Sequence, residues 1–324
     1  MQILITGGGG FLGQKLARAI AVKGQLAGRD VAGLTLVDVA QPAAVEAGFP
    51  VKTVVSDISN RSDVSKIWDQ PFDVVYHLAA VVSGAAEADF DLGLAVNLMG
   101  TVNVLDAARQ QSADGGPVAR CVYASSLAVH GGDEPDPVPE GVELNPQTSY
   151  GTQKAMGELL LQDMSRKGFV DGVGLRLPTV SIRPGKANAA ASSFMSSIFR
   201  DTMEGRTANC PVSKDYPVYH TAPRTIISNL MHAAGVSGKD FGYNRNINLP
   251  GRTDTIGEMI AAMERVAGAE PVQRITWERD PAVEAITSGW RGAVAYDKAV
   301  RLGFTADESF EDSVRWFLED DIRA

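Results

Sequence analysis

Three residues of this chain have the types and the spacing needed to move a proton to or from an alcohol. Tyr150 and Lys154 stand four residues apart, and residues four apart lie on one face of a helix. A Lys154 ammonium beside the Tyr150 phenol would favour the phenolate and lower its pKa from about 10, so that the oxygen could accept a proton. Ser126 belongs to a Ser125-Ser126 pair after an apolar run, and its hydroxyl could hold the alcohol in place. The trio predicts alcohol–carbonyl redox chemistry.

A glycine-rich turn near the N-terminus predicts a dinucleotide site. The segment Thr6-Gly-Gly-Gly-Gly-Phe-Leu-Gly13 follows an apolar strand-like run and begins a helical pattern, which is the context that a dinucleotide turn requires. The first glycine permits a tight turn, the second permits close approach to a pyrophosphate, and the third permits close helix–strand packing. Free N–H groups of the helix N-terminus would face the anion. The predicted contacts are Gly7, Gly10, Phe11, Leu12 and Gly13.

Asp38 stands at the end of the second predicted strand, about where an acid that binds the adenosine ribose belongs. Its alternative role is to cap a helix or turn. A carboxylate repels the 2′-phosphate of NADP, and the following Val-Ala-Gln-Pro supplies no Arg or Lys to bind that phosphate. The sequence therefore predicts NAD as the cofactor, with its nicotinamide beside Tyr150.

Further residues after the predicted strands complete the cofactor site. Asp57-Ile58 could bracket the adenine, although a solvated turn is a serious alternative for Asp57. The small residues of Leu78-Ala79-Ala80 would let the backbone approach the cofactor, whereas His77 is interpreted as a core histidine with satisfied hydrogen bonds. Asn97 lies in a helical pattern, where it could support an active-site water or the Lys154 region, or serve as an interior polar group.

The first half of the chain alternates short apolar runs with helical patterns, which is typical of a parallel sheet covered on both faces. We expect strands over residues 2–6, 33–38, 52–55, 74–78, 120–125 and 172–177, and helices over about 11–28, 62–68, 92–111 and 150–167. Prolines interrupt this pattern after Arg176. Beyond it we expect helices over about 190–204, 226–234, 254–267, 295–302 and 309–319, and strands over 245–249 and 272–278, the first of which returns to the main sheet.

These elements predict an α/β fold, a Rossmann-type doubly wound parallel sheet with a smaller, discontinuous C-terminal substrate domain. The cofactor domain is expected over residues 1–177 plus about 225–250. The substrate domain is expected over about 178–224 and 251–324.

Composition excludes several classes of function. The 324 residues, 44% of them apolar, suffice for a large core. The net charge of −9, without a basic run, argues against nucleic acid as a partner. Cys121 and Cys210 form no metal-ligand pattern, so we expect no metal and a buried, reduced Cys121. The chain opens directly on a strand and has no run of membrane-spanning length, so we expect a cytoplasmic protein without membrane contact.

The ordered motifs resemble the extended short-chain dehydrogenase/reductase family, which includes NAD-dependent nucleotide-sugar epimerases and dehydratases. The matching residues are the glycine turn 6–13, Asp57, His77-Leu-Ala-Ala80, Asn97, Ser125-Ser126, Tyr150-x-x-x-Lys154, Leu175-Arg-Leu-Pro178 and the C-terminal segment 302–316. The resemblance covers nearly the whole chain. It implies that Tyr150 is the acid/base, that Lys154 holds the nicotinamide ribose and lowers the Tyr150 pKa, and that Ser126 orients the reacting hydroxyl. Ser125 and Pro178 would lie beside the nicotinamide.

The segments 181–194 and 218–224 resemble those of the D-erythronate dehydrogenases, a group within this family that oxidises a four-carbon sugar acid at its 2-hydroxyl. An Arg fork can bind a carboxylate through two hydrogen bonds, so Arg183 and Arg224 are candidate carboxylate ligands, with a surface ion pair as the alternative for each. The candidate polar contacts are Ser83, Ser126, Tyr150, Ser192, Ser193 and His220. Capping of the following helix is an equal alternative for Ser192 and Ser193.

The resulting hypothesis is NAD-dependent oxidation of a small sugar acid, with D-erythronate to 2-oxo-tetronate as the best candidate reaction. A nucleotide-sugar epimerase or dehydratase of the same family is the alternative, and a non-catalytic NAD(P)-sensing protein is a further one. We also expect a homodimer, because family members commonly pair the helices at about 92–111 and 150–167. Met156 and Leu160 suit such an interface and would suit a monomer core equally well.

Overall fold

A seven-stranded sheet is the centre of the computed structural model, which describes residues 1–185, 193–281, 283, 287 and 289–322. All its strand pairs are parallel. Its spatial order is β12 (Asn246–Asn248), β8 (Asp171–Leu177), β7 (Arg120–Ser126), β6 (Val74–His77), β1 (Gln2–Thr6), β4 (Gly33–Asp38) and β5 (Val51–Val55). The predicted doubly wound α/β fold is confirmed, including the return of the chain to the sheet at β12.

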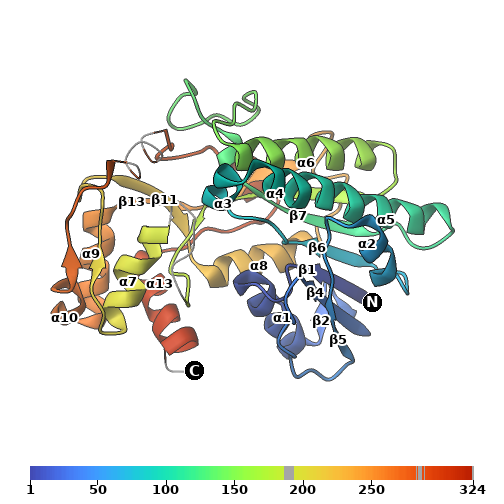
Figure 1. Ribbon diagram of the computed structural model, residues 1–324, viewed down its shortest axis with the longest axis horizontal. Coiled ribbons are helices and arrows are strands. Elements are labelled where there is room, and N and C mark those ends of the chain that lie inside the picture. Colours follow the sequence, from blue (N-terminus) through green and yellow to red (C-terminus); the bar gives the residue numbers. More distant parts are fainter. Residues whose placement is uncertain (186–192, 282, 284–286, 288, 323–324) are drawn as a thin grey trace.

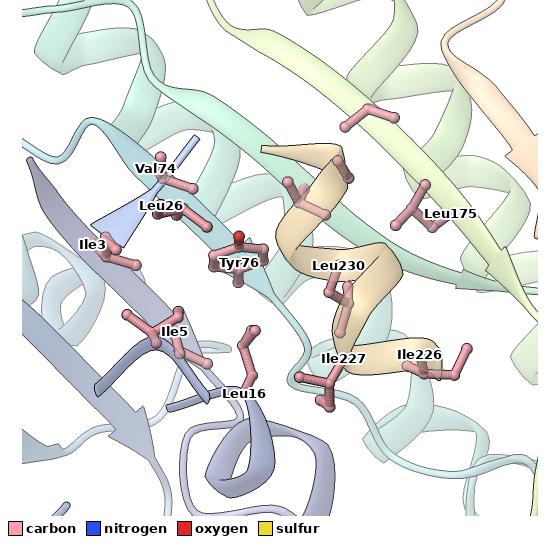
Figure 2. Close-up of a cluster of buried hydrophobic side chains, with 14 of the residues drawn as sticks. Ile3, Ile5, Leu16, Leu26, Val74, Tyr76, Leu175, Ile226, Ile227 and Leu230 are labelled. Carbon is pink, nitrogen blue, oxygen red and sulfur yellow. The ribbon is translucent and has the colours of Figure 1, made fainter. Parts of the chain in front are cut away.

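Helices cover both faces of this sheet, because successive strand side chains point to opposite sides. Ile3 and Ile5 pack with helices α1 (Phe11–Lys23) and α8 (Pro223–Ala233). Figure 2 shows this core, with α8 lying across the strands. Leu4 faces the other layer, formed by α2 (Arg61–Ile67), α5 (Thr101–Ala113) and α6 (Ser149–Arg166). Each fully buried Ile or Leu contributes roughly 1.5–3 kcal/mol of transfer free energy.

Two helical patterns differ from their expected extent. The helix expected over 11–28 ends at Lys23, because Gly24 adopts a left-handed φ of 64° and donates its N–H to the Ile20 carbonyl. A two-stranded hairpin follows, formed by β2 (Gln25–Leu26) and β3 (Arg29–Asp30). The pattern over 92–111 comprises α4 (Phe90–Gly93), a wider π-helical segment at Leu94–Gly100, and α5.

A second group of elements lies to one side of the sheet (Figure 1). Its helices are α7 (Phe194–Met203), α9 (Ile256–Ala267), α10 (Ala269–Val272) and α13 (Phe310–Phe317). Its small sheet has the order β13 (Arg252–Thr255), β11 (Pro217–Thr221) and β9 (Thr179–Val180), and β10 (Ala208–Asn209) pairs with β14 (Ile275–Thr276). The four helices together with β10, β11 and β14 share a separate apolar core.

The division of the chain into two domains stays a prediction, and one packing detail bears on it. Helix α12 (Asp297–Arg301) contributes Ala299 to the core under the main sheet, and Phe304 joins the same core. The chain after 251 therefore contacts both apolar cores.

Both cysteines are buried free thiols, as predicted for Cys121. Within the described residues, no helix has the length and apolar character needed to cross a membrane.

Candidate active site

The strand ends bring the predicted site residues to one edge of the sheet, where open parallel sheets bind ligands. Ser126 is the last residue of β7 and Tyr150 is the second residue of α6. Gly151 explains their closeness, because a Cβ there would lie only 2.0 Å from the Ala128 carbonyl oxygen. Helix α6 therefore begins in direct contact with the turn that follows β7. The Thr148 hydroxyl caps this helix by accepting the Gly151 N–H.

The Ser126 hydroxyl lies near the Tyr150 phenol. The Tyr150 side chain keeps some contact with solvent, but burial of its surroundings raises the pKa of the phenol to about 12, and the nearby Ser126 hydroxyl opposes that rise. Ser126 Oγ also accepts the Ala128 N–H at 3.1 Å. Ser126 can therefore cap the end of its strand and still contact the Tyr150 phenol.

Lys154 is buried one helical turn below Tyr150. Its Nζ lies 5.7 Å from the centroid of the Tyr150 ring and 4.9 Å from that of Tyr123. Burial lowers the pKa of the Lys154 ammonium to about 7, and the charge of Glu158 opposes this change. Burial is the main influence on the Tyr150 pKa, and lowering of that pKa by Lys154 stays a prediction.

Ser125 bonds a buried carboxylate on α6, and its place beside the nicotinamide stays a prediction. Its hydroxyl donates to the Glu158 carboxylate at 2.5 Å, and Arg176 holds that carboxylate from the other side at 2.7 Å. Glu158 was not among the residues predicted from the sequence. A signal was available, because Glu158 follows Lys154 by four residues and so lies on the same helix face.

The glycine turn has the close backbone approaches expected of a dinucleotide site. Gly7 has φ 73°, and a Cβ there would lie 2.7 Å from the Ala79 nitrogen. A Cβ on Gly13 would lie 2.2 Å from the Gly7 carbonyl oxygen, so the third glycine lets α1 pack on the turn. Phe11 and Leu12 form the first turn of α1, whose N-cap is Gly10. These features fit a pyrophosphate at the helix N-terminus.

The acids that follow the strands both take part in local turns. Asp38 accepts the Gly9 N–H at 3.0 Å, which fixes the glycine turn against the end of β4. Asp57 accepts the Ser59 N–H at 2.9 Å, the turn role that the sequence left open. Ile58 is buried and touches Gly100, where a Cβ would lie 2.7 Å from the isoleucine side chain. Contact of Asp57 and Ile58 with adenine stays a prediction.

The residues after β6 are held in place by Asn97. Its side chain bonds both backbone groups of Val81, at 2.8 and 3.1 Å, and donates to Gln153 at 2.8 Å. The segment Leu78–Ala80 is thereby tied to α6. Pro178 lies between β8 and β9, so it follows the strand end that neighbours β7.

His77 is a core histidine, as interpreted from the sequence. Its two ring nitrogens bond the Thr6 and Thr101 hydroxyls at 2.7 and 2.9 Å. Burial lowers its pKa to about 3, so the ring stays neutral.

The residues predicted to contact the substrate do not all gather at one place. Arg183 is largely covered, and the nearby Arg200 guanidinium adds to the burial that lowers its pKa. Arg224 instead pairs with Asp320 and, at 2.9 Å, with Glu319, which is the ion-pair alternative. His220 is fully buried and bonds Asp254 at 2.9 Å. Ser83 begins α3 (Ser83–Ala88), and Ser193 is the N-cap of α7. Ser192 lies outside the described residues.

No cluster of three or more His, Cys, Asp or Glu side chains suited to a metal ion occurs in the described part of the chain.

Comparison with known proteins gives near full-length matches. The family described as NAD dependent epimerase/dehydratase matches residues 3–219. D-erythronate dehydrogenase of Cupriavidus necator is 46% identical over 99% of this chain and 98% of its own length. The enzyme of that name from Haemophilus influenzae is 37% identical over 99% and 100%. A crystal structure described as a nucleoside-diphosphate-sugar epimerase from Agrobacterium tumefaciens has a TM-score of 0.95 at 42% identity, over 100% of this chain and 95% of that one. The names of these relatives divide between a dehydrogenase and an epimerase.

Proposed function

Because this chain belongs to the NAD-dependent epimerase/dehydratase family and is an NAD-dependent oxidoreductase, we propose that it oxidises the 2-hydroxyl of a small sugar acid. D-erythronate is the best candidate, with 2-oxo-tetronate as the product. The single observation that carries the proposal is the meeting of Ser126, at the end of β7, with Tyr150 and the buried Lys154 at the start of α6, where Lys154 Nζ bonds the Ala124 carbonyl oxygen at 2.8 Å. Two relatives named D-erythronate dehydrogenase, which match over nearly the full length, support the choice of substrate.

In the proposed reaction Tyr150 is the general base. Ser126 and Tyr150 hold the substrate hydroxyl, the Tyr150 oxygen takes the hydroxyl proton, and a C=O bond forms at C2 as its hydride leaves. Bound NAD⁺ supplies the hydride acceptor. Since burial raises the Tyr150 pKa to about 12, positive charge has to reach this phenol before it ionises near neutral pH. Lys154 is the cation on the same helix face.

Arg183 is the preferred candidate for the substrate carboxylate. Its guanidinium lies near that of Arg200, close enough that the second charge lowers the Arg183 pKa. Arg200 is itself paired with Asp201 at 2.8 Å, and the planar Arg183 guanidinium could bind a carboxylate through two hydrogen bonds. Arg224 is the second candidate; it pairs with Asp320 and Glu319 near the C-terminal end of the described chain.

The decisive experiment is NADH production measured over a panel of C4–C6 sugar acids, with a nucleotide-sugar as control. We expect net NAD⁺ reduction with a four-carbon acid. Conversion of the nucleotide-sugar without net NADH would support the epimerase alternative, which recycles its hydride and which the name of the Agrobacterium structure suggests. Absence of any turnover would favour the NAD(P)-sensing alternative.

We further propose a homodimer formed through the outer face of α5 and α6, with the cytoplasm as its location. Apolar side chains are exposed there: Met156 and Leu159 on α6, Met99 on the π-helical segment before α5, and Phe90 on α4. A hollow of about 390 Å³ beside them is lined in part by Phe90, Leu94 and Met156. Burying such side chains against a second copy would remove apolar surface from water.

Size-exclusion chromatography with light scattering tests this dimer. Leu159→Glu is expected to give monomers. Val22→Glu, at an exposed position on α1, serves as the matched control and should leave the mass unchanged. A monomeric wild-type protein would exclude the proposal.

A further inference from the structure

A buried ion pair stands directly behind the proposed catalytic residues and has no part in the mechanism so far. Glu158 on α6 is fully buried and Arg176 on β8 is nearly so. The guanidinium contacts both carboxylate oxygens, Nε at 2.9 Å from Oε1 and Nη2 at 2.7 Å from Oε2. The pair therefore has the two-bond geometry that makes Arg–carboxylate contacts strong.

This pair has connections on both sides. Toward the strand end, Glu158 Oε1 accepts the Ser125 hydroxyl at 2.5 Å, next to Ser126. Away from it, Arg176 Nη1 lies 3.3 Å from Asn248 Oδ1 on β12 and 3.4 Å from His130 Nε2. Strands β7 and β8 thus meet helix α6 at the Glu158 carboxylate, and β12 joins them through Arg176.

Glu158 also follows Lys154 by four residues on one face of α6, and its negative charge acts on the lysine ammonium. The other titratable groups around the ammonium are the phenols of Tyr150 and Tyr123 and the neutral ring of His77. Neither phenol is ionised near neutral pH, because burial raises both of their pKa values. Burial disfavours the charged lysine, and the Glu158 charge works against that effect.

We infer that Glu158, held by Arg176, is a positioning residue that keeps Lys154 protonated and aligns the Ser125–Ser126 strand end. This inference rests on the proposed function, in which the Lys154 ammonium assists ionisation of Tyr150. A purely structural ion pair is the rival interpretation. It is a serious one, because removing one partner of a buried pair is strongly destabilising whatever its role.

The test compares three variants by the pH dependence of kcat/KM for sugar-acid oxidation and by unfolding temperature. Glu158→Gln keeps the shape and an acceptor for Ser125 but removes the charge. Glu158→Gln/Arg176→Met also removes the buried cation, so the fold should recover stability. Glu158→Asp keeps the charge on a shorter side chain. Asp163→Asn on the same helix, whose exposed carboxylate pairs with Arg166, is the control.

We expect the alkaline limb of the profile to move down by about one pH unit or more in Glu158→Gln, because Lys154 then loses its proton earlier, and to move down less in the double variant, because loss of the Arg176 cation partly compensates. Glu158→Asp should lose rate but keep the wild-type position of that limb. Asp163→Asn should match the wild type. A double variant with wild-type profile and rate would overturn the inference and leave a structural role.

Failure of the proposed function gives a different pattern. In that case the wild-type protein itself shows no NAD⁺ reduction with sugar acids, or Tyr150→Phe retains full turnover. An active wild type with a Tyr150-dependent rate and an unshifted double variant would refute only the role of Glu158.

Discussion

The Lys154 ammonium donates a hydrogen bond to the Ala124 carbonyl oxygen at 2.8 Å. This bond joins helix α6 to the end of strand β7, and so fixes the helix against the strand that carries Ser126. It also places a cation in a site from which water is excluded. The proposed reaction needs the buried Lys154 ammonium, but burying that charge lowers the stability of the fold.

Lys154→Met should abolish turnover and stabilise the fold. The folded-state pKa of about 7 lies below the ordinary value of 10.5, so the unfolded chain binds more protons between these values. Wild-type stability should therefore rise from about pH 7 to about pH 10.5. The free energy of unfolding of the variant should not rise over this range. The variant should exceed the wild type most below pH 7, by on the order of a few kcal/mol. Denaturant unfolding at pH 6, 8 and 10 measures this.

The control for this gain is Lys23→Met, at an exposed position near the end of α1. It should show no pH-dependent stabilisation. Equal gains in the two variants would mean that burial of Lys154 carries no penalty.

Tyr150→Phe should reduce kcat by about 10²–10⁴-fold, because general-base assistance is lost. NAD binding, followed by quenching of protein fluorescence or by calorimetry, should be retained, since the ring and the Lys154 contact persist. Undiminished turnover would refute the assignment of Tyr150 as the base.

Asp38→Asn should weaken discrimination against NADP by about 10–100-fold, measured as the ratio of kcat/KM for the two cofactors. The amide oxygen can still accept the Gly9 N–H, so the glycine turn should keep its shape. Asp57→Asn is the matched comparison, since Asp57 also accepts a turn N–H. A larger NADP effect at residue 57 would contradict the ribose assignment.

Arg183→Ala should raise the KM for the sugar acid by at least about 10-fold, the loss expected for one charge-assisted contact. Arg224→Ala should change that KM little. It should instead lower the unfolding temperature, because the C-terminal segment loses its ion pairs with Arg224. The reverse order of effects on KM would move the carboxylate site to Arg224.

Asp254→Asn should destabilise the protein at neutral pH and much less at pH 2. Hydrogen bonds from His220 and, to a smaller extent, from Arg252 lower the Asp254 pKa to about 2. The ionised Asp254 carboxylate contributes its full stabilisation at pH values above 3.8, the pKa of the group in the unfolded chain. This stabilisation is lost as the pH falls through about 2. Solvent screening limits it to about 1–2 kcal/mol. Acid unfolding curves of the two proteins should converge at low pH.

Local pattern was sufficient for much of the fold. The runs that form β1 and β4 match their expected extents, because continuous apolar residues suit a strand buried on both faces. The end of α1 was missed because apolar periodicity continues past Gly24, whose left-handed φ ends the helix. A glycine signal can stop a helix without interrupting its apolar pattern.

The site shows where sequence reasoning stops. The Tyr150–Lys154 spacing is local, so the shared helix face could be foreseen. The contacts of Arg224 with Glu319 and Asp320 and of Ser125 with Glu158 join segments far apart in the chain. No periodicity encodes such pairs. The same limit applies to the Tyr150 pKa, which depends on burial rather than on the neighbouring lysine alone.

The position of β12 also constrains the order in which the chain can fold. This strand pairs with β8, and it is synthesised only after α7, β11 and α8. A nascent or truncated chain that stops before Asn246 exposes the backbone of β8 as an open sheet edge. Such edges readily recruit strands from other molecules. The edge of the main sheet at β8 is therefore covered only late in synthesis, when β12 has been made. We expect chains interrupted between β8 and β12 to be prone to aggregation.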